Sequence, residues 1–357
     1  MSSNRILCAF AMIACLVLGA DNPAPKGYVC GRAKAPIVVD GRLDEESWQL
    51  ASWTDDFVDI QGDAKPLPRF RTRVKMLWDD HYFYIAAQLD EPHVWGKLTD
   101  HDSVIFQDND FEVFIDPDGD NHEYYEIEIN ALNTEWDLLL EKPYRDGGPA
   151  VNAWEIPGLK TATNVNGTIN DPKDIDESWT VEFAFPWKVL AERAHRASPP
   201  NAGDQWRVNF SRVEWEHRIE GQTYKKVEGK PEDNWVWSPQ GAIDMHRPER
   251  FGYVQFSGEL PPKDSYHPDP TGPARDRLMA IYRAQREYHA KNKAWAGSLE
   301  ELSMADLKSG EGESRPVIEA TPEGYTATIK LNPTEGRPEQ TLIIRADSRL
   351  SQQNAKP

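Results

Sequence analysis

The 357-residue sequence contains few cysteines and, beyond its first 20 residues, no long hydrophobic run. Its three cysteines are Cys8, Cys15 and Cys30. Only Cys30 lies beyond the hydrophobic N-terminal segment, so removal of that segment leaves no pair for an internal disulfide. No later segment is apolar enough to cross a bilayer. We therefore expect a mature chain without a transmembrane segment, stabilised by an ordinary hydrophobic core.

Basic residues are scarce relative to acidic ones. Lys and Arg total 40 against 59 Asp and Glu, which gives a formal net charge of −19. This excess argues against nucleic acid or anionic lipid as a partner. The sequence also has no Gly-x-Ser-x-Gly, no His-Glu-x-x-His, no phosphate-binding glycine loop and no nucleophilic cysteine with a partner. Its nine histidines are scattered without metal-ligand spacing. These absences favour binding over catalysis.

The N-terminal residues 1–20 have the features of a secretory signal peptide. Arg5 supplies the positive region, residues 6–18 the apolar core, and a Gly-Ala pair precedes Asp21. Cleavage there predicts a secreted protein, located in the periplasm, at the cell surface or outside the cell. Cys15 offers the alternative of a lipoprotein.

Short runs of alternating apolar and polar residues dominate the region from residue 28 to residue 258, and helical periodicity is nearly absent there. Two segments, 45–51 and 187–195, favour short helices. Many strands without alternating helices predict a mainly β fold, namely a two-sheet antiparallel β-sandwich of the jelly-roll kind. The predicted strands include 71–78, 82–89, 111–115, 124–130, 179–185, 206–215 and 251–256.

Two alternating runs between Asp108 and Asn130 flank an Asp/Gly/Asn-rich turn, which predicts a β-hairpin. One face carries the apolar residues Phe111, Val113, Ile115, Tyr125, Ile127 and Ile129. The other face carries Glu112, Phe114, Tyr124, Glu126, Glu128 and Asn130. If the apolar face packs on the core, the second face presents carboxylates and an amide beside aromatic rings. Sugars are bound by such groups, through hydrogen bonds to hydroxyls and stacking on the C–H face.

The composition changes after residue 258. Residues 259–275 are rich in proline and predict an extended linker. Residues 276–357 then show a helical pattern around Leu278–Tyr288, a short helix starting at Ser298, and three strands. This indicates a small α+β accessory domain. It resembles the soluble part of type IV pilins and pseudopilins but lacks their membrane-spanning helix, so filament assembly does not follow.

Several motifs of the first region resemble family 9 carbohydrate-binding modules, which accompany secreted xylanases and other glycoside hydrolases. The resemblance covers residues 28–258 and implies a β-sandwich that binds sugar. Its motifs are Ile37–Gly41 with Asp44, Glu45 and Trp48, then Arg73–Asp80, Tyr82–Tyr84, Asp110–Asp116, Trp179–Glu182 and Phe251–Gly252.

The resemblance also implies site residues. The family holds a sugar end between two tryptophans; their positions fall here on Phe106 and near Met245, where no aromatic stands. Glu112 matches a binding glutamate, whereas Glu128 replaces a family arginine. Trp95, Trp136 and Trp237 are further candidates for aromatic rings that stack on a sugar, and Asn130 is a further candidate for hydrogen bonding to it.

Asp116, Asp118 and Asp120 alternate in a turn, a spacing that can wrap a cation. Their hard oxygens favour calcium, which the family often carries as a structural ion. The alternative is an Asx-rich turn with solvated carboxylates.

The sequence as a whole favours secreted, non-catalytic binding of a polysaccharide or oligosaccharide, accessory to glycoside hydrolysis and carbohydrate catabolism. One alternative is a glycoside hydrolase that uses Glu112 with a second carboxylate. Another is a structural surface protein that has lost sugar binding. The sugar and the oligomeric state stay open.

Overall fold

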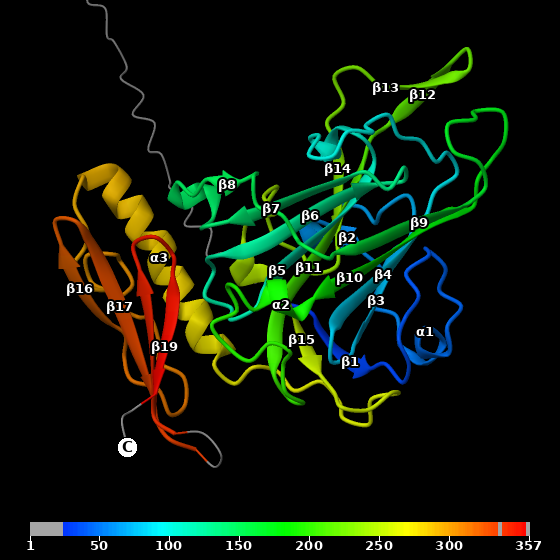
Figure 1. Ribbon diagram of the computed structural model, residues 1–357. Coiled ribbons are helices and arrows are strands. Elements are labelled where there is room, and N and C mark those ends of the chain that lie inside the picture. Colours follow the sequence, from blue (N-terminus) through cyan, green and yellow to red (C-terminus); the bar gives the residue numbers. More distant parts are fainter. Residues whose placement is uncertain (1–23, 335–337, 355–357) are drawn as a thin grey trace, which may run out of the picture.

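The computed structural model describes residues 24–334 and 338–354. The expected signal peptide and Cys15 lie outside the described residues. The fold is mainly β, as the alternating sequence pattern predicted, with a small second unit at one side of the β-sandwich (Figure 1).

The β-sandwich consists of two sheets that share strand β1 (Gly27–Arg32). The first sheet has the order β8-β7-β6-β5-β11-β15-β1, and β14 and β2 extend it beyond β11. Its strands are β8 (Ala150–Val151), β7 (Glu135–Leu140), β6 (Tyr124–Asn130), β5 (Asp110–Asp116), β11 (Gln205–Glu214), β15 (Gly252–Phe256), β14 (Asp233–Val236) and β2 (Val58–Asp59). The second sheet has the order β1-β3-β4-β10-β9, with β3 (Thr72–Trp78), β4 (Tyr82–Asp90), β10 (Ser178–Pro186) and β9 (Lys160–Asn166).

Strand β1 departs from the expected antiparallel arrangement, because it pairs in parallel with both of its neighbours. Residues 27–30 pair with β15, and Gly31 and Arg32 pair with β3. The strand therefore passes from one sheet to the other at the corner of the sandwich. All other strand pairs of the two sheets in the described residues are antiparallel, as predicted.

Residues that alternate along the strands fill the space between the sheets. On β5 and β6 the inward side chains are the six apolar ones that the hairpin pattern assigned to the core, among them Phe111 and Ile127. Each such side chain contributes about 1.5–3 kcal/mol when fully buried. The opposite face of the same two strands is thereby fixed, because successive side chains point to opposite sides of a sheet.

Short helical segments and one hairpin complete this unit. The helices α1 (Glu46–Leu50) and α2 (Trp187–Leu190) are close to the predicted segments, and the β12–β13 hairpin projects from one end (Figure 1). The hairpin strands are β12 (His217–Glu220) and β13 (Thr223–Lys226). The 3-10 helices are η1 (Gly62–Ala64), η2 (Ile105–Gln107), η3 (Tyr144–Asp146) and η4 (Pro248–Arg250).

The C-terminal unit packs helix α3 (Gly272–Asn292) against a four-stranded antiparallel sheet. Leu278, Ile281 and Tyr282 form its separate core with residues of the sheet. The helix begins inside the range 259–275 that the sequence suggested as a linker. The expected helix at Ser298 is a turn, although Ser298 Oγ accepts a hydrogen bond from the N–H of Glu301 (3.2 Å). The sheet strands are β16 (Val317–Thr321), β17 (Gly324–Leu331), β18 (Gln340–Arg345) and β19 (Leu350–Asn354), of which β19 was not predicted.

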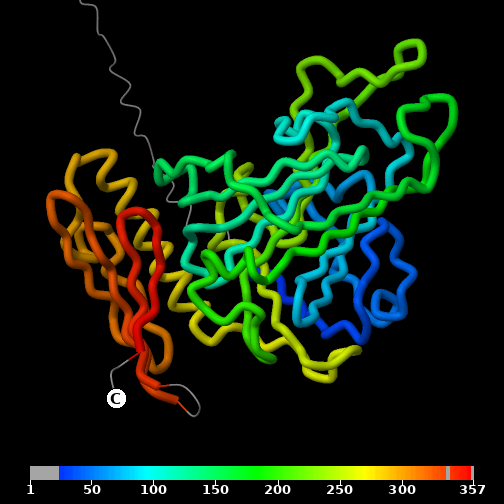
Figure 2. The backbone as a smooth tube through the Cα atoms, viewed as in Figure 1, coloured from blue at the N-terminus to red at the C-terminus, as the bar shows by residue number. Residues whose placement is uncertain are grey.

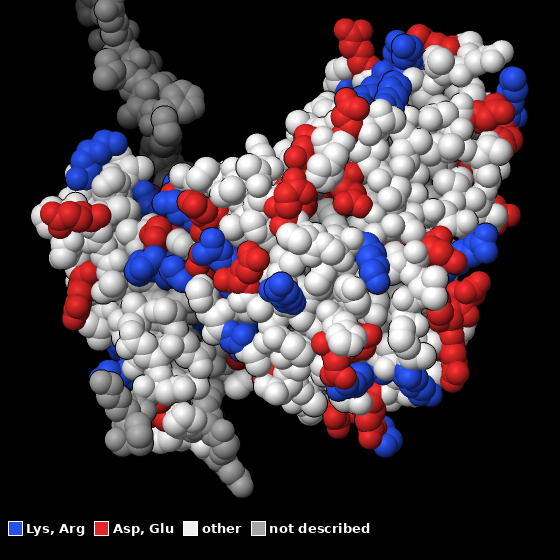
Figure 3. All heavy atoms as spheres, in the orientation of Figure 1, with Lys and Arg blue, Asp and Glu red and all other residues white. Residues whose placement is uncertain are grey.

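The two units touch through the turn between β5 and β6, and the tube in Figure 2 shows them side by side. Arg349 Nε donates to Asp120 Oδ2 (2.6 Å), and Asn121 Nδ2 donates to the carbonyl of Ser348 (3.0 Å). No helix in the described ranges is long and apolar enough to cross a membrane. On the face drawn in Figure 3, acidic and basic side chains are interspersed.

Candidate functional site

A cavity of about 330 Å³ lies over the acidic face of β5 and β6. Its lining comes from five strands of the first sheet, β5, β6, β7, β11 and β14, from η2 and η3, and from the segment that follows β14. All lining residues lie between Ile60 and His246, so the C-terminal unit does not cover the cavity. The lining residues are Ile60, Phe106, Glu112, Phe114, Glu126, Glu128, Trp136, Leu138, Tyr144, Val213, Glu232, Asn234, Ile243, Asp244, Met245 and His246.

Two half-buried aromatic rings lie together in the lining. The rings of Phe106 and Trp136 have centroids 6.4 Å apart and planes inclined by 30°. Phe106 is fixed at both backbone groups, because its N–H donates to Glu128 Oε2 (2.9 Å) and its carbonyl accepts from Trp215 Nε1 (2.9 Å). A sugar ring held between two aromatic rings would lie about 3.5–4.0 Å from each of them, so the two aromatic rings would be about 7–8 Å apart. The pair therefore suits a shared stacking platform and is too close to hold a sugar ring between its members.

The cavity floor is acidic. Glu112, Glu126 and Glu128 expose 5%, 4% and 3% of their surface, and Asp110 beside them exposes none. Glu112 lies directly opposite Glu128 across the β5–β6 ladder, and Asp110, Glu112 and Glu128 each bring a carboxylate oxygen within 4.8 Å of the others. This face of the hairpin is therefore enclosed, because residues of the η2 segment and of the segment after β14 also line the cavity.

Burial changes the ionisation of these carboxyl groups. It raises the pKa of Glu112 to about 7. Burial, and then the charge of Glu112, raise the pKa values of Asp110, Glu126 and Glu128 well above their usual range. Burial removes the hydration of a charged carboxylate and neighbouring like charges repel, so both effects favour the protonated form of these groups.

Two of the aromatic residues predicted to stack on a sugar do not line the cavity. Trp95 and Trp237 each expose only 1% of their surface. Trp95 stacks on Tyr224 (6.4 Å between centroids), and Trp237 belongs to the core between the sheets. The structure corrects both expectations, because large aromatics in loops and short strands gain more from burial than from exposure.

Asn130 is also corrected as a sugar-binding residue. Its Nδ2 donates to the carbonyl of Leu98 (2.9 Å) and to Asp108 Oδ2 (3.1 Å). Its Oδ1 accepts from the N–H groups of Leu132 and Thr134, at 3.0 Å each. The side chain is completely buried and holds the turn after β6, which leaves it no capacity for a ligand.

The structure brings together Phe106, Glu112, Glu128 and Trp136, and it adds residues that sequence reasoning missed. Met245, at the second family clamp position, also lines the cavity. Tyr144 and His246 are new; their rings lie 4.3 Å apart, and His246 Nδ1 lies 2.9 Å from the Tyr124 hydroxyl. They come from segments without periodicity, so no sequence signal pointed to them.

The three aspartates of the predicted calcium turn do converge, with oxygens within 4.8 Å of one another. Asp116 accepts the N–H groups of Gly119 (2.9 Å) and Asn121 (3.0 Å), as in an Asx-rich turn. Asp120 is paired with Arg349. The three carboxylates supply the hard oxygen ligands that calcium prefers. Asp118 accepts a hydrogen bond from the N–H of Asp120 (3.2 Å).

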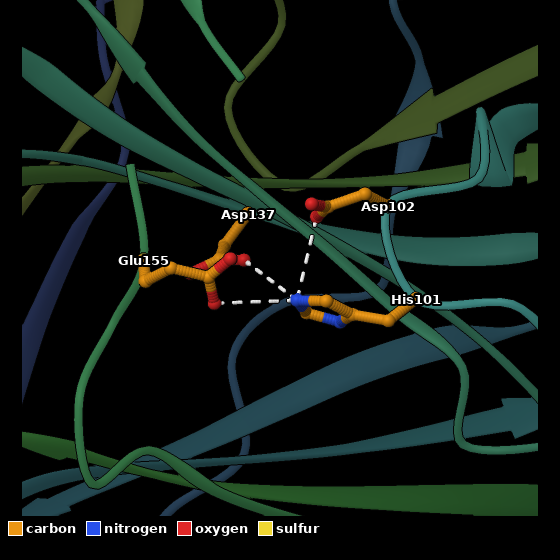
Figure 4. A group of neighbouring side chains, drawn as sticks. All are labelled: His101, Asp102, Asp137 and Glu155. Atoms are coloured by element: carbon orange, nitrogen blue, oxygen red, sulfur yellow. Dashed lines mark hydrogen bonds and ion pairs between the residues drawn. The ribbon is translucent and has the colours of Figure 1, made fainter. Parts of the chain in front are cut away.

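A separate cluster of titratable side chains, around His101, lies outside the cavity. His101 Nε2 lies 3.3 Å from Glu155 Oε2, 3.4 Å from Asp102 Oδ1 and 3.8 Å from Asp137 Oδ1, as Figure 4 shows. The surrounding carboxylates outweigh the effect of burial and raise the pKa of His101. His101 and Glu155 are about half exposed, so this cluster resembles a surface ion-pair network.

A larger cavity of about 530 Å³ lies between the two units. It is lined mainly by charged and amide side chains and has no pair of aromatic rings. The smaller cavity over β5 and β6 combines rings with carboxylates and is the better candidate site.

Comparison with known proteins finds a family similar to part of this chain. Residues 39–203 match the family model described as carbohydrate family 9 binding domain-like. This segment is similar to that family. The resemblance expected from the sequence is thus confirmed, and four of the cavity's lining elements, η2, β5, β6 and β7, lie within the matched range. The similarity of the C-terminal unit to pilins stays a prediction.

More distant relatives are also known. The chain is 24% identical over 153 residues to "Exoglucanase XynX" of Acetivibrio thermocellus, a match that covers 43% of this chain but only 12% of that relative. Family 9 carbohydrate-binding modules of Caldicellulosiruptor kristjanssonii, solved with cellotriose and with glucose, are each 15% identical with a TM-score of 0.44. They cover 68% of this chain and 99% and 100% of their own. At this distance their ligands carry no argument for this chain.

Proposed function

We propose that the β-sandwich binds a polysaccharide or oligosaccharide without catalysis, in the cavity over β5 and β6. The observation that carries the proposal is the convergence of the Phe106–Trp136 ring pair with Glu112 and Glu128 inside a family 9-like domain. The rings offer an apolar face to a pyranose, and the carboxylates accept hydrogen bonds from hydroxyls.

A panel of immobilised and soluble glycans tests this proposal. Retention of at least one glycan, lost in Phe106→Ala, supports it; silence across the panel favours the alternative of a structural surface protein. Trp53→Ala is a matched control, because Trp53 is half-buried under the guanidinium of Arg73 (4.2 Å from its ring centroid) and does not line the cavity.

A glycoside hydrolase is the second candidate, and the proximity of Glu112 to Glu128 favours it. Glycosidases use two carboxyl groups on either side of the scissile bond, and these two have oxygens within 4.8 Å of each other. Release of reducing ends that Glu112→Gln abolishes would establish the enzyme. Binding without product supports the non-catalytic function.

The biological setting is part of the proposal. We infer that the protein is exported and serves carbohydrate degradation carried out by other chains. Mass spectrometry of the exported protein tests this: a mature chain that starts at Asp21 is expected, and an acylated Cys15 would instead identify a lipoprotein.

Structural calcium is proposed for Asp116, Asp118 and Asp120. Calcium should then raise the melting temperature of the protein, and Asp118→Asn should reduce that increase. An equal increase in melting temperature in the variant would show that calcium does not bind at this turn.

A further inference from the structure

The acidic floor of the cavity gathers four buried carboxyl groups that have no basic side chain beside them among the described residues. None of Asp110, Glu112, Glu126 and Glu128 forms an ion pair with a basic side chain in the described part of the chain. Two buried oxygens, Asp110 Oδ2 and Glu126 Oε2, have no hydrogen-bond partner there. A buried charge is normally paired, so this arrangement points to a positive group supplied by a ligand.

Several other buried glutamates of the sandwich do have charged or hydrogen-bonding partners. Glu91 and Glu214 share the guanidinium of Arg212, at 2.7 and 2.9 Å. Glu182 accepts three N–H bonds, from Asp40, Gly41 and Trp48.

The aromatic residues around the acidic floor fit a cation equally well. Phe106 and Trp136 are half-buried, and Tyr144 is about half exposed. The negative faces of such rings attract ammonium groups, and a charge-assisted hydrogen bond to a carboxylate is about twice as strong as a neutral one. Rings and carboxylates together form a site for a ligand that has both an apolar face and a positive charge.

We propose that the cavity selects saccharides that carry a free amino group, such as glucosamine oligosaccharides, with the ammonium held by Glu112 and Glu128 and the sugar face stacked on Phe106 and Trp136. This rests on the proposed function, because it assumes that the cavity binds a saccharide. A neutral sugar would leave the facing carboxylates without a counter-charge, whereas an amino sugar supplies one at the same ring position.

A bare divalent cation is the competing occupant of the same floor, since three of the carboxylates meet. An ion alone would fill little of the 330 Å³ cavity and would leave the ring pair without a role. The amino sugar uses both the carboxylates and the rings.

Calorimetric titration of the full mature chain, in slightly acidic buffer with a chelator, tests the proposal. The probes are cellotriose and the fully deacetylated glucosamine trisaccharide, which differ at the amino position. We expect at least about tenfold tighter binding of the amino trisaccharide, equivalent to about 1.4 kcal/mol. The double variant Glu112→Gln/Glu128→Gln should lose this preference and still bind cellotriose, whereas Glu46→Gln, an exposed residue in α1, should keep it.

Equal or tighter binding of cellotriose would overturn the inference but leave the proposed function standing. Binding of neither trisaccharide until calcium replaces the chelator would identify a metal site and also overturn it. Failure to bind any saccharide in either buffer would remove both proposals. Circular dichroism of the double variant checks that a lost preference is not a loss of fold.

Discussion

Glu112 on β5 and Glu128 on β6 are a directly opposed cross-strand pair, and both side chains are buried. Like charges in this relationship destabilise a sheet. Glu128 thus gives Glu112 no oppositely charged partner across the ladder. The sandwich tolerates this because its stability comes from the opposite face of the same strands, which packs Phe111, Val113 and Ile127 into the core.

The platform rings should dominate affinity for the saccharide. Phe106→Ala and Trp136→Ala should each weaken binding tenfold or more, since a stacking aromatic contributes about 1–3 kcal/mol. Affinity electrophoresis or calorimetry measures the change. Unchanged affinity in Phe106→Ala, alongside the expected normal binding of Trp53→Ala, would remove the platform from the site.

Neutralising Glu126 should stabilise the protein. Its buried Oε2 has no partner in the described residues, so Glu126→Gln removes charge repulsion and should raise the free energy of unfolding by about 1 kcal/mol. Because the folded-state pKa of Glu126 is raised, its ionisation costs stability as the pH rises above about 4.3, and the gain should grow in alkaline buffer.

Glu182→Gln is the matched comparison in urea denaturation. The same chemical change there removes the charge that accepts three N–H bonds, and we expect a loss of about 1–3 kcal/mol. If both variants shift stability in the same direction, the distinction between satisfied and unsatisfied carboxylates fails.

His246 should make stability depend on pH. Burial, with a smaller effect of Arg145, lowers its pKa from 6.5 to about 4. Between these values the unfolded chain binds more protons than the folded one, so stability falls as the pH drops below 6.5. The loss attributable to His246 over this whole interval is on the order of 3 kcal/mol. In His246→Gln, the free energy of unfolding should change less with pH over this interval. Equal pH dependence in the variant and the unmodified protein would show that His246 is not the group responsible.

The ion pair between the two units should contribute measurably. Arg349→Ala leaves Asp120 without its charged partner at a largely buried contact and should cost about 1–2 kcal/mol. Arg315→Ala removes an exposed pair with Glu300 and should cost under about 0.5 kcal/mol. Equal effects in thermal unfolding would show that the Asp120 contact is no stronger than a surface pair.

Alternation along the chain predicted seven strands of the sandwich and the core-facing side of the β5–β6 hairpin, but not strands such as β7 and β9. The period of two decides which side chains share a face, so Phe111 and Glu112 were correctly assigned to opposite faces. The parallel pairing of strand β1 was not predicted, because it depends on long-range topology and leaves no local signal in the sequence.

The site was predicted only in part. Phe106, Glu112, Glu128 and Trp136 were named from the sequence and line one cavity. That the face would be enclosed was not predictable, since it depends on where irregular segments such as 243–246 fold back. The burial of Trp95 was missed for the same reason, because its partner Tyr224 comes from a distant hairpin.

The most direct test of the account is a crystal structure of the mature chain with a bound glucosamine or cello-oligosaccharide. We expect a sugar ring in the cavity over β5 and β6, stacked on Phe106 and Trp136 and within hydrogen-bond distance of Glu112 or Glu128. A sugar bound elsewhere, with this cavity holding only solvent, would contradict it.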